Sequence, residues 1–164
     1  MSLIAQLLQT LQGMAGYAGP GVQIVSVIEP ADVHLELDVT TADRYSCGFR
    51  ELRLNVPPFS HTAPGQLKQW ADDVCQRVTY LLEQLDTVEF DPQTGQAQIR
   101  STRPDVQANQ TRYYEIVLQL SGQLRLNRYQ AIPGMPREQI DVQATHELLQ
   151  KLVPDLVQTA LTGK

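Results

Sequence analysis

A pattern of two strands followed by a helix recurs along this chain. Each passage has apolar residues alternating with polar ones (33–39 and 114–120) and a leucine-rich pentapeptide (Glu51–Asn55 and Gln123–Asn127). A proline-containing segment and an amphipathic helical stripe then follow in both passages. This order predicts an antiparallel sheet covered by helices on one face. Either an internal duplication or convergent strand patterning accounts for the five-letter echo, and the sequence leaves both open.

Three amphipathic helices are predicted from apolar residues spaced three and four apart. The first occupies residues 1–15, with Ser2 as its N-cap. The second is expected from Gln66 to Leu85 and the third from Leu148 to Leu161. Pro154 lies inside the third stripe, where we expect a kink or a restart of the helix.

The N-terminal helix presents its apolar residues, Ile4, Leu7, Leu8 and Leu11, on one face. A helix of about 11 residues is marginal on its own in water, so this face must pack on protein. Three glycines within residues 16–21 predict a flexible hinge. We expect the helix to dock across the interface with a second copy rather than on its own sheet.

Two hairpin registers follow from keeping apolar residues on one face of the sheet. In the first hairpin the expected pairs are Asp91–Gln96, Phe90–Ala97 and Val88–Ile99. In the second, a three-residue loop at 121–123 is expected, with the pairs Leu120–Leu124 and Leu118–Leu126.

These elements predict an α+β fold, with a single antiparallel sheet of about six to seven strands and helices packed mainly on one face. The expected order is α-β-β-β-α-β-β-β-β-α. A chain of 164 residues fits one domain, 1–164, made of the N-terminal helix (1–15), a first half (22–101) and a second half (102–164). The order resembles that of acidic, dimeric secretion chaperones of similar size, in layout only, and layout does not carry function.

Charge is unevenly distributed along a chain that is rich in glutamine and has a formal net charge of −5. Residues 1–43 contain no lysine or arginine, whereas six arginines lie between Arg100 and Arg137, against Asp105 and Glu115. Such an uneven charge distribution favours head-to-tail pairing of two copies, or binding of a partner whose charge is opposite to that of the surface it meets. The overall acidity argues against a general nucleic-acid role.

The expected location is the cytoplasm, without membrane contact. Cys47 and Cys75 occupy different settings, one in a loop and one in a helical stripe, which indicates a reducing compartment. No apolar run reaches the roughly 18 residues that a membrane span needs. The N-terminal apolar residues have no basic leader and are interrupted by glutamines, unlike a signal peptide.

Cys47 is a candidate reactive thiol because Arg44 and Arg50 flank it in the sequence, and nearby cations lower a thiol pKa. A nucleophile also needs a base, and no histidine lies at a motif spacing from it. We therefore prefer the interpretation of Cys47 as an ordinary cysteine. No catalytic residue is assigned.

His34, Glu36 and Asp38 are expected side by side on the solvent face of one strand. Same-face neighbours along a strand lie about 7 Å apart, too far for all three to reach one ion unaided. Arg53 on the next strand is expected to pair with Glu36 or Asp38. We assign no metal site and no cofactor.

The second half interleaves arginines and tyrosines on two neighbouring strands, which could stack bases and hold phosphates. The residues are Arg112, Tyr113, Arg125, Asn127, Arg128 and Tyr129. Together with Arg53 and the four apolar residues of the N-terminal helix, they form the predicted interaction surface.

The leading functional hypothesis is a non-catalytic module that binds another protein and itself, as a homodimer. Two alternatives rank below it. One is a small-ligand binder with a cavity between a helix and the sheet, although Trp70, Phe90, Tyr114 and Leu118 are large enough to fill that space. The other is a single-stranded nucleic-acid binder that uses the Arg/Tyr-rich second half.

Overall fold

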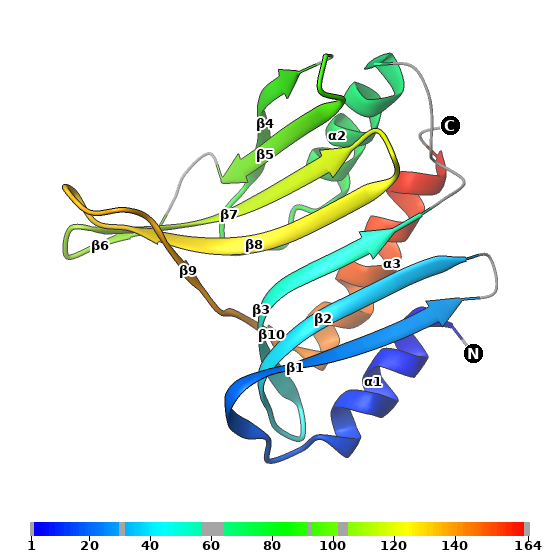
Figure 1. Cartoon of the computed structure of the whole chain (residues 1–164), viewed down its shortest axis with the longest axis vertical. Helices are drawn as coiled ribbons and strands as arrows, with labels where there is room; N and C mark the ends of the chain where they lie inside the picture. The colour runs from blue at the N-terminus through cyan, green and yellow to red at the C-terminus, as the bar shows by residue number, and fades with distance from the viewer. Residues whose placement is uncertain (1, 30–31, 57–63, 92, 102–104, 163–164) are drawn as a thin grey trace.

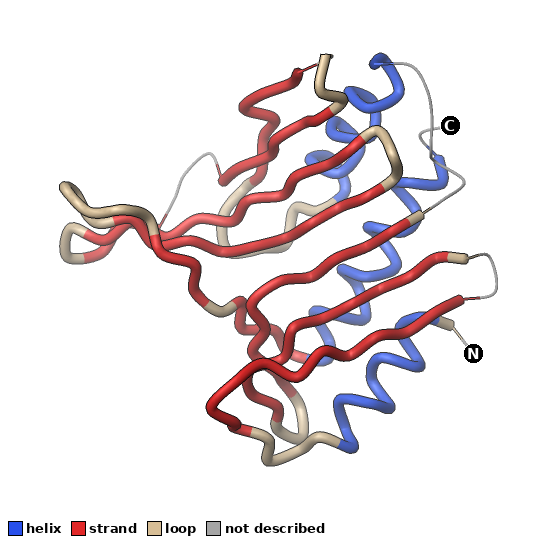
Figure 2. The backbone as a smooth tube through the Cα atoms, in the orientation of Figure 1, coloured by secondary structure: helices blue, strands red, loops and turns tan. Residues whose placement is uncertain are grey.

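The computed structural model describes residues 2–29, 32–56, 64–91, 93–101 and 105–162. Within them, one antiparallel sheet carries three helices on one face (Figure 1, Figure 2). The helices are α1 (Leu3–Gly13), α2 (Pro64–Arg77) and α3 (His146–Thr162). The proline-rich segment before α2 lies largely outside the described residues.

Seven main strands cross the described part of the sheet in the order β1-β2-β3-β8-β7-β5-β4. Their bounds are β1 Ala18–Glu29, β2 Val33–Ala42, β3 Ser46–Asn55, β8 Gln123–Ala131, β7 Gln110–Gln119, β5 Gln96–Ser101 and β4 Leu85–Asp91. Three short strands pair beside this path: β6 (Asp105–Gln107) with β7, β9 (Glu138–Ile140) with β8, and β10 (Val142–Thr145) with β3. The predicted α+β class and its antiparallel sheet are confirmed.

The two echoing pentapeptides lie side by side at the centre of the sheet. β3 and β8 pair antiparallel, with Leu52 opposite Leu126 and Leu54 opposite Leu124. Arg53 lies opposite Arg125 at the middle of this pairing. The helix that follows the first pentapeptide, α2, contacts β4, β5 and β7, whereas α3, which follows the second, contacts β3 and β10.

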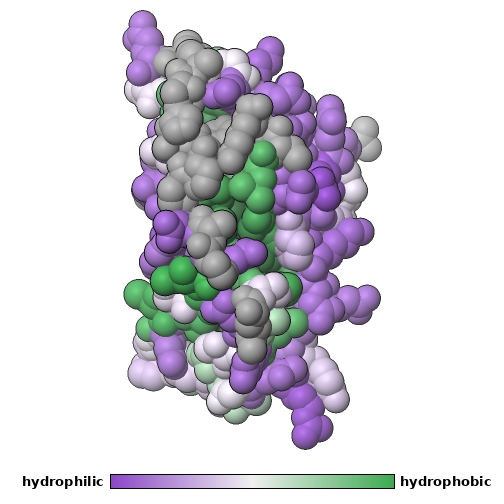
Figure 3. Space-filling model, turned by 90° about the vertical axis from the view of Figure 1, so that its right-hand side faces the viewer, coloured by the Kyte–Doolittle hydropathy of each residue, from purple (hydrophilic) through white to green (hydrophobic). Residues whose placement is uncertain are grey.

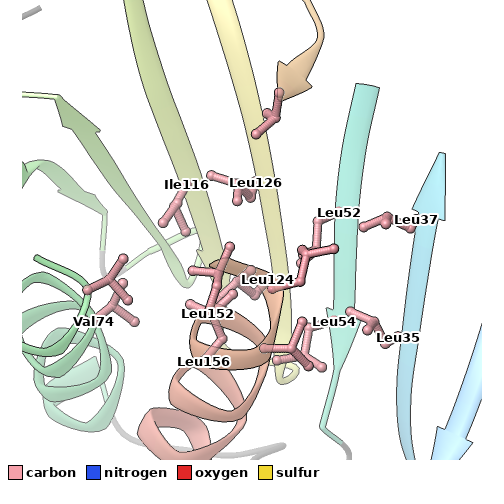
Figure 4. Close-up of a cluster of buried hydrophobic side chains, with 14 of the residues drawn as sticks. Leu35, Leu37, Leu52, Leu54, Val74, Ile116, Leu124, Leu126, Leu152 and Leu156 are labelled. Carbon is pink, nitrogen blue, oxygen red and sulfur yellow. The ribbon is translucent and has the colours of Figure 1, made fainter. Parts of the chain in front are cut away.

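The core fills the layer between the sheet and the helices (Figure 4). Leucines from β2, β3 and β8 meet Val74 of α2 and Leu152 and Leu156 of α3, and all of these side chains are buried. Burying each such side chain contributes about 1.5–3 kcal/mol. Trp70 of α2 is fully buried and donates a hydrogen bond to Thr159 Oγ1 of α3 (3.2 Å), which fixes these helices against each other.

The alternation predicted for residues 33–39 is confirmed. Val33, Leu35, Leu37 and Val39 are buried, while the residues between them are half-exposed on the other face.

The second helix is shorter than predicted, since it ends at Arg77 rather than at Leu85. Val78 and Leu81 are buried from an irregular segment, and Leu85 is buried as the first residue of β4. Their spacing continues the helical pattern, so periodicity alone did not mark the end of the helix.

The third helix starts at His146 and runs through Pro154 without a break, so the predicted restart is wrong. Proline removes one backbone hydrogen bond. The buried stripe of Leu149, Leu152, Val153 and Leu156 spans this position and holds the helix together.

The predicted flexible hinge after α1 is wrong. Gly16 N–H donates to Ala42 O (2.8 Å), Ala42 N–H donates to Tyr17 O (2.9 Å), and β1 already begins at Ala18. Leu7 and Leu11 are fully buried within the chain itself, where α1 packs against β1, β2 and α3. The expectation that this helix face docks on a second copy is therefore wrong, and self-association needs another surface.

The β4–β5 hairpin confirms two predicted pairs and corrects the third. Phe90 lies opposite Ala97 and Asp91 opposite Gln96, as expected. A bulge between Thr87 and Glu89 places Thr87, not Val88, opposite Ile99. Val88 is consequently 52% exposed.

The β7–β8 loop has the predicted three residues but lies one position earlier, at 120–122. The pairs are Leu118–Leu124 and Ile116–Leu126. Gly122 adopts a positive φ of 91°, which glycine accepts at little cost, and Leu120 N–H donates to Gly95 O (2.8 Å). The observed partner of each β7 residue thus lies two residues away from the predicted partner. Because side chains alternate with a period of two, every side chain stays on its predicted face.

Candidate functional site

The side of the sheet turned away from the helices, here called the open face, carries two adjoining hollows. The first, of about 490 Å³, is lined by His34, Glu36, Glu51, Arg53, Leu54, Asn55, Gln123, Leu124 and Arg125. The second, of about 600 Å³, is lined by Gly19, Pro20, Gly21, Val22, Asp38, Thr40, Thr41, Arg50, Glu51, Gln139 and Asp141. Glu51 lines both, so the two hollows adjoin at this residue; together, along β2, β3 and the start of β8, they are here called the depression.

Arg53 is the centre of an ion-pair network on the floor of this depression. Its guanidinium donates to Glu36 (2.8 Å), to both oxygens of Asp38 (2.8 and 2.9 Å) and to Glu51 (3.0 Å). The predicted pairing of Arg53 with Glu36 or Asp38 is confirmed, and both carboxylates take part. The Asp38 hydrogen bonds, with those from Glu36 and Glu51, raise the Arg53 pKa against the effect of burial.

This network also bears on metal binding. Glu36 and Asp38 are engaged by Arg53, and His34 lies further along β2. In the part of the chain that the structure describes, no three metal-ligating side chains come together.

Arg125 lies opposite Arg53 but in a different setting. It is exposed, lines the first hollow, and has no ion-pair partner among the described residues. Its other cross-strand neighbour is Val117. A charged donor is thus free at the wall of the depression.

A second cluster joins tyrosines and arginines on β7, β8 and the segment before β9. Tyr113 and Tyr129 have ring centroids 5.9 Å apart. The Arg137 guanidinium lies 3.8 Å from the Tyr129 centroid, and that of Arg100 lies 5.0 Å from the Tyr113 centroid. The rings expected to stack on a ligand are therefore covered by the protein's own arginines.

Glu115 forms ion pairs with both of these arginines. It accepts from Arg137 (2.7 Å) and Arg100 (3.0 Å), and its side chain is 7% exposed. Burial works to raise the Glu115 pKa, but the hydrogen bonds from Arg137 and Arg100 outweigh it and hold the pKa below its usual value.

Arg128 does not lie on the predicted interaction surface. It is buried on the helix side of the sheet, where it pairs with Glu83 (3.1 Å) and lies 4.2 Å from the Tyr114 centroid. Asn127 is also buried and donates to Glu51 (3.1 Å). Arg112 is exposed and donates to Gln130 (3.1 Å), away from both hollows.

Several residues of these ion-pair clusters were missed by sequence reasoning. Glu83 was placed in a helix, and Glu115, Arg100 and Arg137 were counted only as part of the charge balance. Alternation along β7 could have placed Glu115 beside Tyr113, two residues away on the same face. Nothing in the sequence brings Arg137 to Tyr129, because that contact depends on the path of an irregular segment.

Cys47 is buried rather than reactive. Its side chain is 2% exposed, and burial, assisted by the nearby Asp43 carboxylate, raises its pKa to about 12. The expected lowering by Arg44 and Arg50 is therefore wrong. Arg50 pairs instead with Asp141 (2.8 Å), and Arg44 is exposed.

Exposed apolar side chains gather on the edge strand β1. Val22, Ile24 and Ile28 are 46%, 60% and 50% exposed. Figure 3, which views the right-hand side of Figure 1, shows hydrophobic surface in the middle and lower part of that face. In α1, Ile4 and Leu8 remain half-buried beside the fully buried Leu7 and Leu11.

No protein-family model, curated protein or solved structure matches this chain. In the residues that the structure describes, no helix has the length and apolar character needed to cross a membrane. A functional assignment therefore rests on the geometry of the open face.

Proposed function

We propose that this protein is a non-catalytic protein-interaction module that receives a segment of another protein on its open face. The observation that carries this proposal is the depression made by the two adjoining hollows, on the side of the sheet opposite the helices. Sheet faces of antiparallel proteins are commonly solvated, but a hollowed face with mixed polar and apolar walls fits a protein segment.

The lining of the depression suits recognition better than chemistry. It combines charged donors and acceptors with backbone from the β1 bulge at Gly19–Val22. Arg125 offers a planar, multidentate donor for a carboxylate or a backbone carbonyl of the bound segment. The one thiol considered as a nucleophile, Cys47, is buried in the core.

The two alternatives have less support. The small-ligand alternative requires a cavity in the layer between helices and sheet, but Trp70, Leu118 and Tyr114 pack there and are only 0–3% exposed. For nucleic acid, Arg100, Arg128 and Arg137 are already paired with carboxylates. A titration with single-stranded RNA and DNA at low salt tests the second alternative, because phosphate contacts weaken steeply with salt.

The test of the proposal is selection of binders from a displayed random-peptide library, followed by affinity measurement with two arginine variants. Arg125→Glu reverses a charge in the first hollow, whereas Arg112→Glu makes the same change on an exposed residue outside both hollows. We expect Arg125→Glu to weaken binding at least about tenfold, as loss of a charged hydrogen bond does, and Arg112→Glu to leave it unchanged. Equal affinities for both variants and the unchanged protein would place binding elsewhere and overturn the proposal.

A further inference from the structure

The N-terminal edge of the molecule carries no charged side chain. From Ser2 to Ile28 the sequence contains no Asp, Glu, Lys, Arg or His, and the first charged side chain is Glu29. These residues form α1 and most of β1, which pack against each other at one end of the sheet (Figure 1). Depletion of charge marks the centre of protein–protein interfaces. In a protein of net charge −5, two copies meet with least repulsion at such an edge.

The two edges of the sheet differ in how they are protected against pairing. The far edge strand, β4, carries Asp86, Glu89 and Asp91 and is bulged. Charges and bulges are the usual devices that keep an edge strand from adding another strand. The part of β1 from Gln23 to Glu29 pairs with β2 without a register shift and exposes Ile24 and Ile28. β1 is therefore the edge that remains suited to pairing.

The sequence of this edge is a palindrome, Ile24-Val25-Ser26-Val27-Ile28. If two copies pair antiparallel about Ser26, Ile24 of one lies opposite Ile28 of the other on the open face. Val25 then lies opposite Val27 on the core face, where α1 buries both. Such self-complementarity is what a two-fold symmetric interface requires, and apolar cross-strand pairs stabilise it.

The residues that flank the palindrome, Gln23 and Glu29, are also complementary. The same register puts Gln23 of one copy opposite Glu29 of the other, so an amide can donate to a carboxylate at both ends of the strand pair. Gln6 of α1 donates to Ile28 O (2.9 Å). A carbonyl oxygen accepts two hydrogen bonds, so this contact is compatible with strand pairing.

We propose that two copies of this chain associate through β1, antiparallel about Ser26, and so join their two sheets into one. The occupant of the exposed β1 edge is thus a second copy. Ile24 and Ile28 line neither hollow of the open face, so the side chains proposed to pair are separate from those that line the depression. The two proposals can fail separately.

Sedimentation velocity across about a hundredfold range of concentration tests the dimer, because association is driven by mass action. The unchanged protein is expected to be a dimer at the higher concentrations. The double variant Ile24→Lys/Ile28→Lys is expected to be a monomer with unchanged circular dichroism, because both side chains are exposed in the single chain. Leu82→Lys, at an 82% exposed position outside β1, is the control and is expected to remain a dimer.

A cysteine at the proposed two-fold axis tests the register. In a Cys75→Ser background, Ser26→Cys is expected to form a disulfide-linked dimer under mild oxidation, since residue 26 opposes itself. Val106→Cys, 65% exposed on β6, is expected to form little disulfide-linked dimer under the same conditions, because this position lies outside the proposed interface. An unchanged protein that is monomeric throughout, a double lysine variant that stays dimeric, or cross-linking of Ser26→Cys no more efficient than that of Val106→Cys would each overturn the proposal.

Discussion

At the scale of single residues, the pair formed by Glu83 and Arg128 places two charges inside the core. Their side chains are 4% and 7% exposed, and the shortest contact between them is 3.1 Å. Ser101 also donates to Glu83 (3.4 Å), and the Arg128 guanidinium lies over Tyr114. Each charge depends on its partner, because either one alone would be left desolvated.

Glu83→Ala is therefore expected to lower the free energy of unfolding by about 3–5 kcal/mol, because it leaves Arg128 buried without a counter-charge. The double variant Glu83→Leu/Arg128→Met, which removes both charges, is expected to recover most of this loss. Urea denaturation of the three proteins measures the effect. A single variant as stable as the double variant would mean that Arg128 reaches water when Glu83 is removed.

Glu115 links stability to pH. Its pKa in the folded protein lies below its ordinary value of 4.5, so the ionised form is the one that folding stabilises. Its contribution is fully present above pH 4.5 and is lost as the pH falls through the lower, folded-state pKa. We expect Glu115→Gln to be less stable than the unchanged protein at pH 7 and to lose less stability on acidification below pH 4.5. Glu89→Gln, at an exposed carboxylate of β4, is the control and should keep the acid sensitivity of the unchanged protein.

At the scale of elements, α1 behaves as part of the core. Leu7→Ala is expected to cost about 2–5 kcal/mol of stability, because it leaves a cavity at a fully buried position. Leu8→Ala, on the half-buried flank of the same helix, is expected to cost clearly less. Thermal and urea unfolding measure both. Equal small losses would show that α1 is not packed on the sheet as described.

The accuracy of sequence-based prediction differed among the elements for physical reasons. Strand faces were predictable because the side-chain period of two leaves little freedom once one face is buried, as in residues 33–39. The end of α2 was not, because Leu81 and Leu85 keep a helical spacing while buried from other structure. The bulge that exposes Val88 was also invisible, since it depends on β4 pairing with β5.

The candidate site was predictable only where it depends on alternation along neighbouring strands. The contact of Arg53 with Glu36 and Asp38 followed from strand faces. Arg128 has the parity of Leu124 and Leu126, so alternation already turned it toward the helices, but its partner Glu83 was assigned to a helix. The second hollow depends on the β1 bulge and on the path of β9, which local patterns do not encode.

At the scale of the whole molecule, the two proposed surfaces differ in charge density: one is lined by many charged side chains and the other by none. The depression on the open face is lined by four carboxylates and three arginines, whereas the α1–β1 edge is uncharged up to Glu29. Salt screens interactions between exposed charges but leaves the burial of apolar side chains in place. The two surfaces should therefore respond differently to ionic strength.

The salt dependence of the dimer separates the β1 interface from head-to-tail pairing, in which the arginine-rich second half of one copy meets an acidic surface of another. For pairing through β1, the main charge effect is the repulsion between two copies that each carry −5, so added salt is expected to leave dimerisation unchanged or to tighten it. Head-to-tail pairing rests on attraction between opposite charges and would loosen with salt. Sedimentation at low and at about 0.5 M salt, where the screening length is only a few ångströms, distinguishes the two outcomes. A dimer that dissociates as salt rises would reject the β1 interface and favour contact between the oppositely charged regions of the chain.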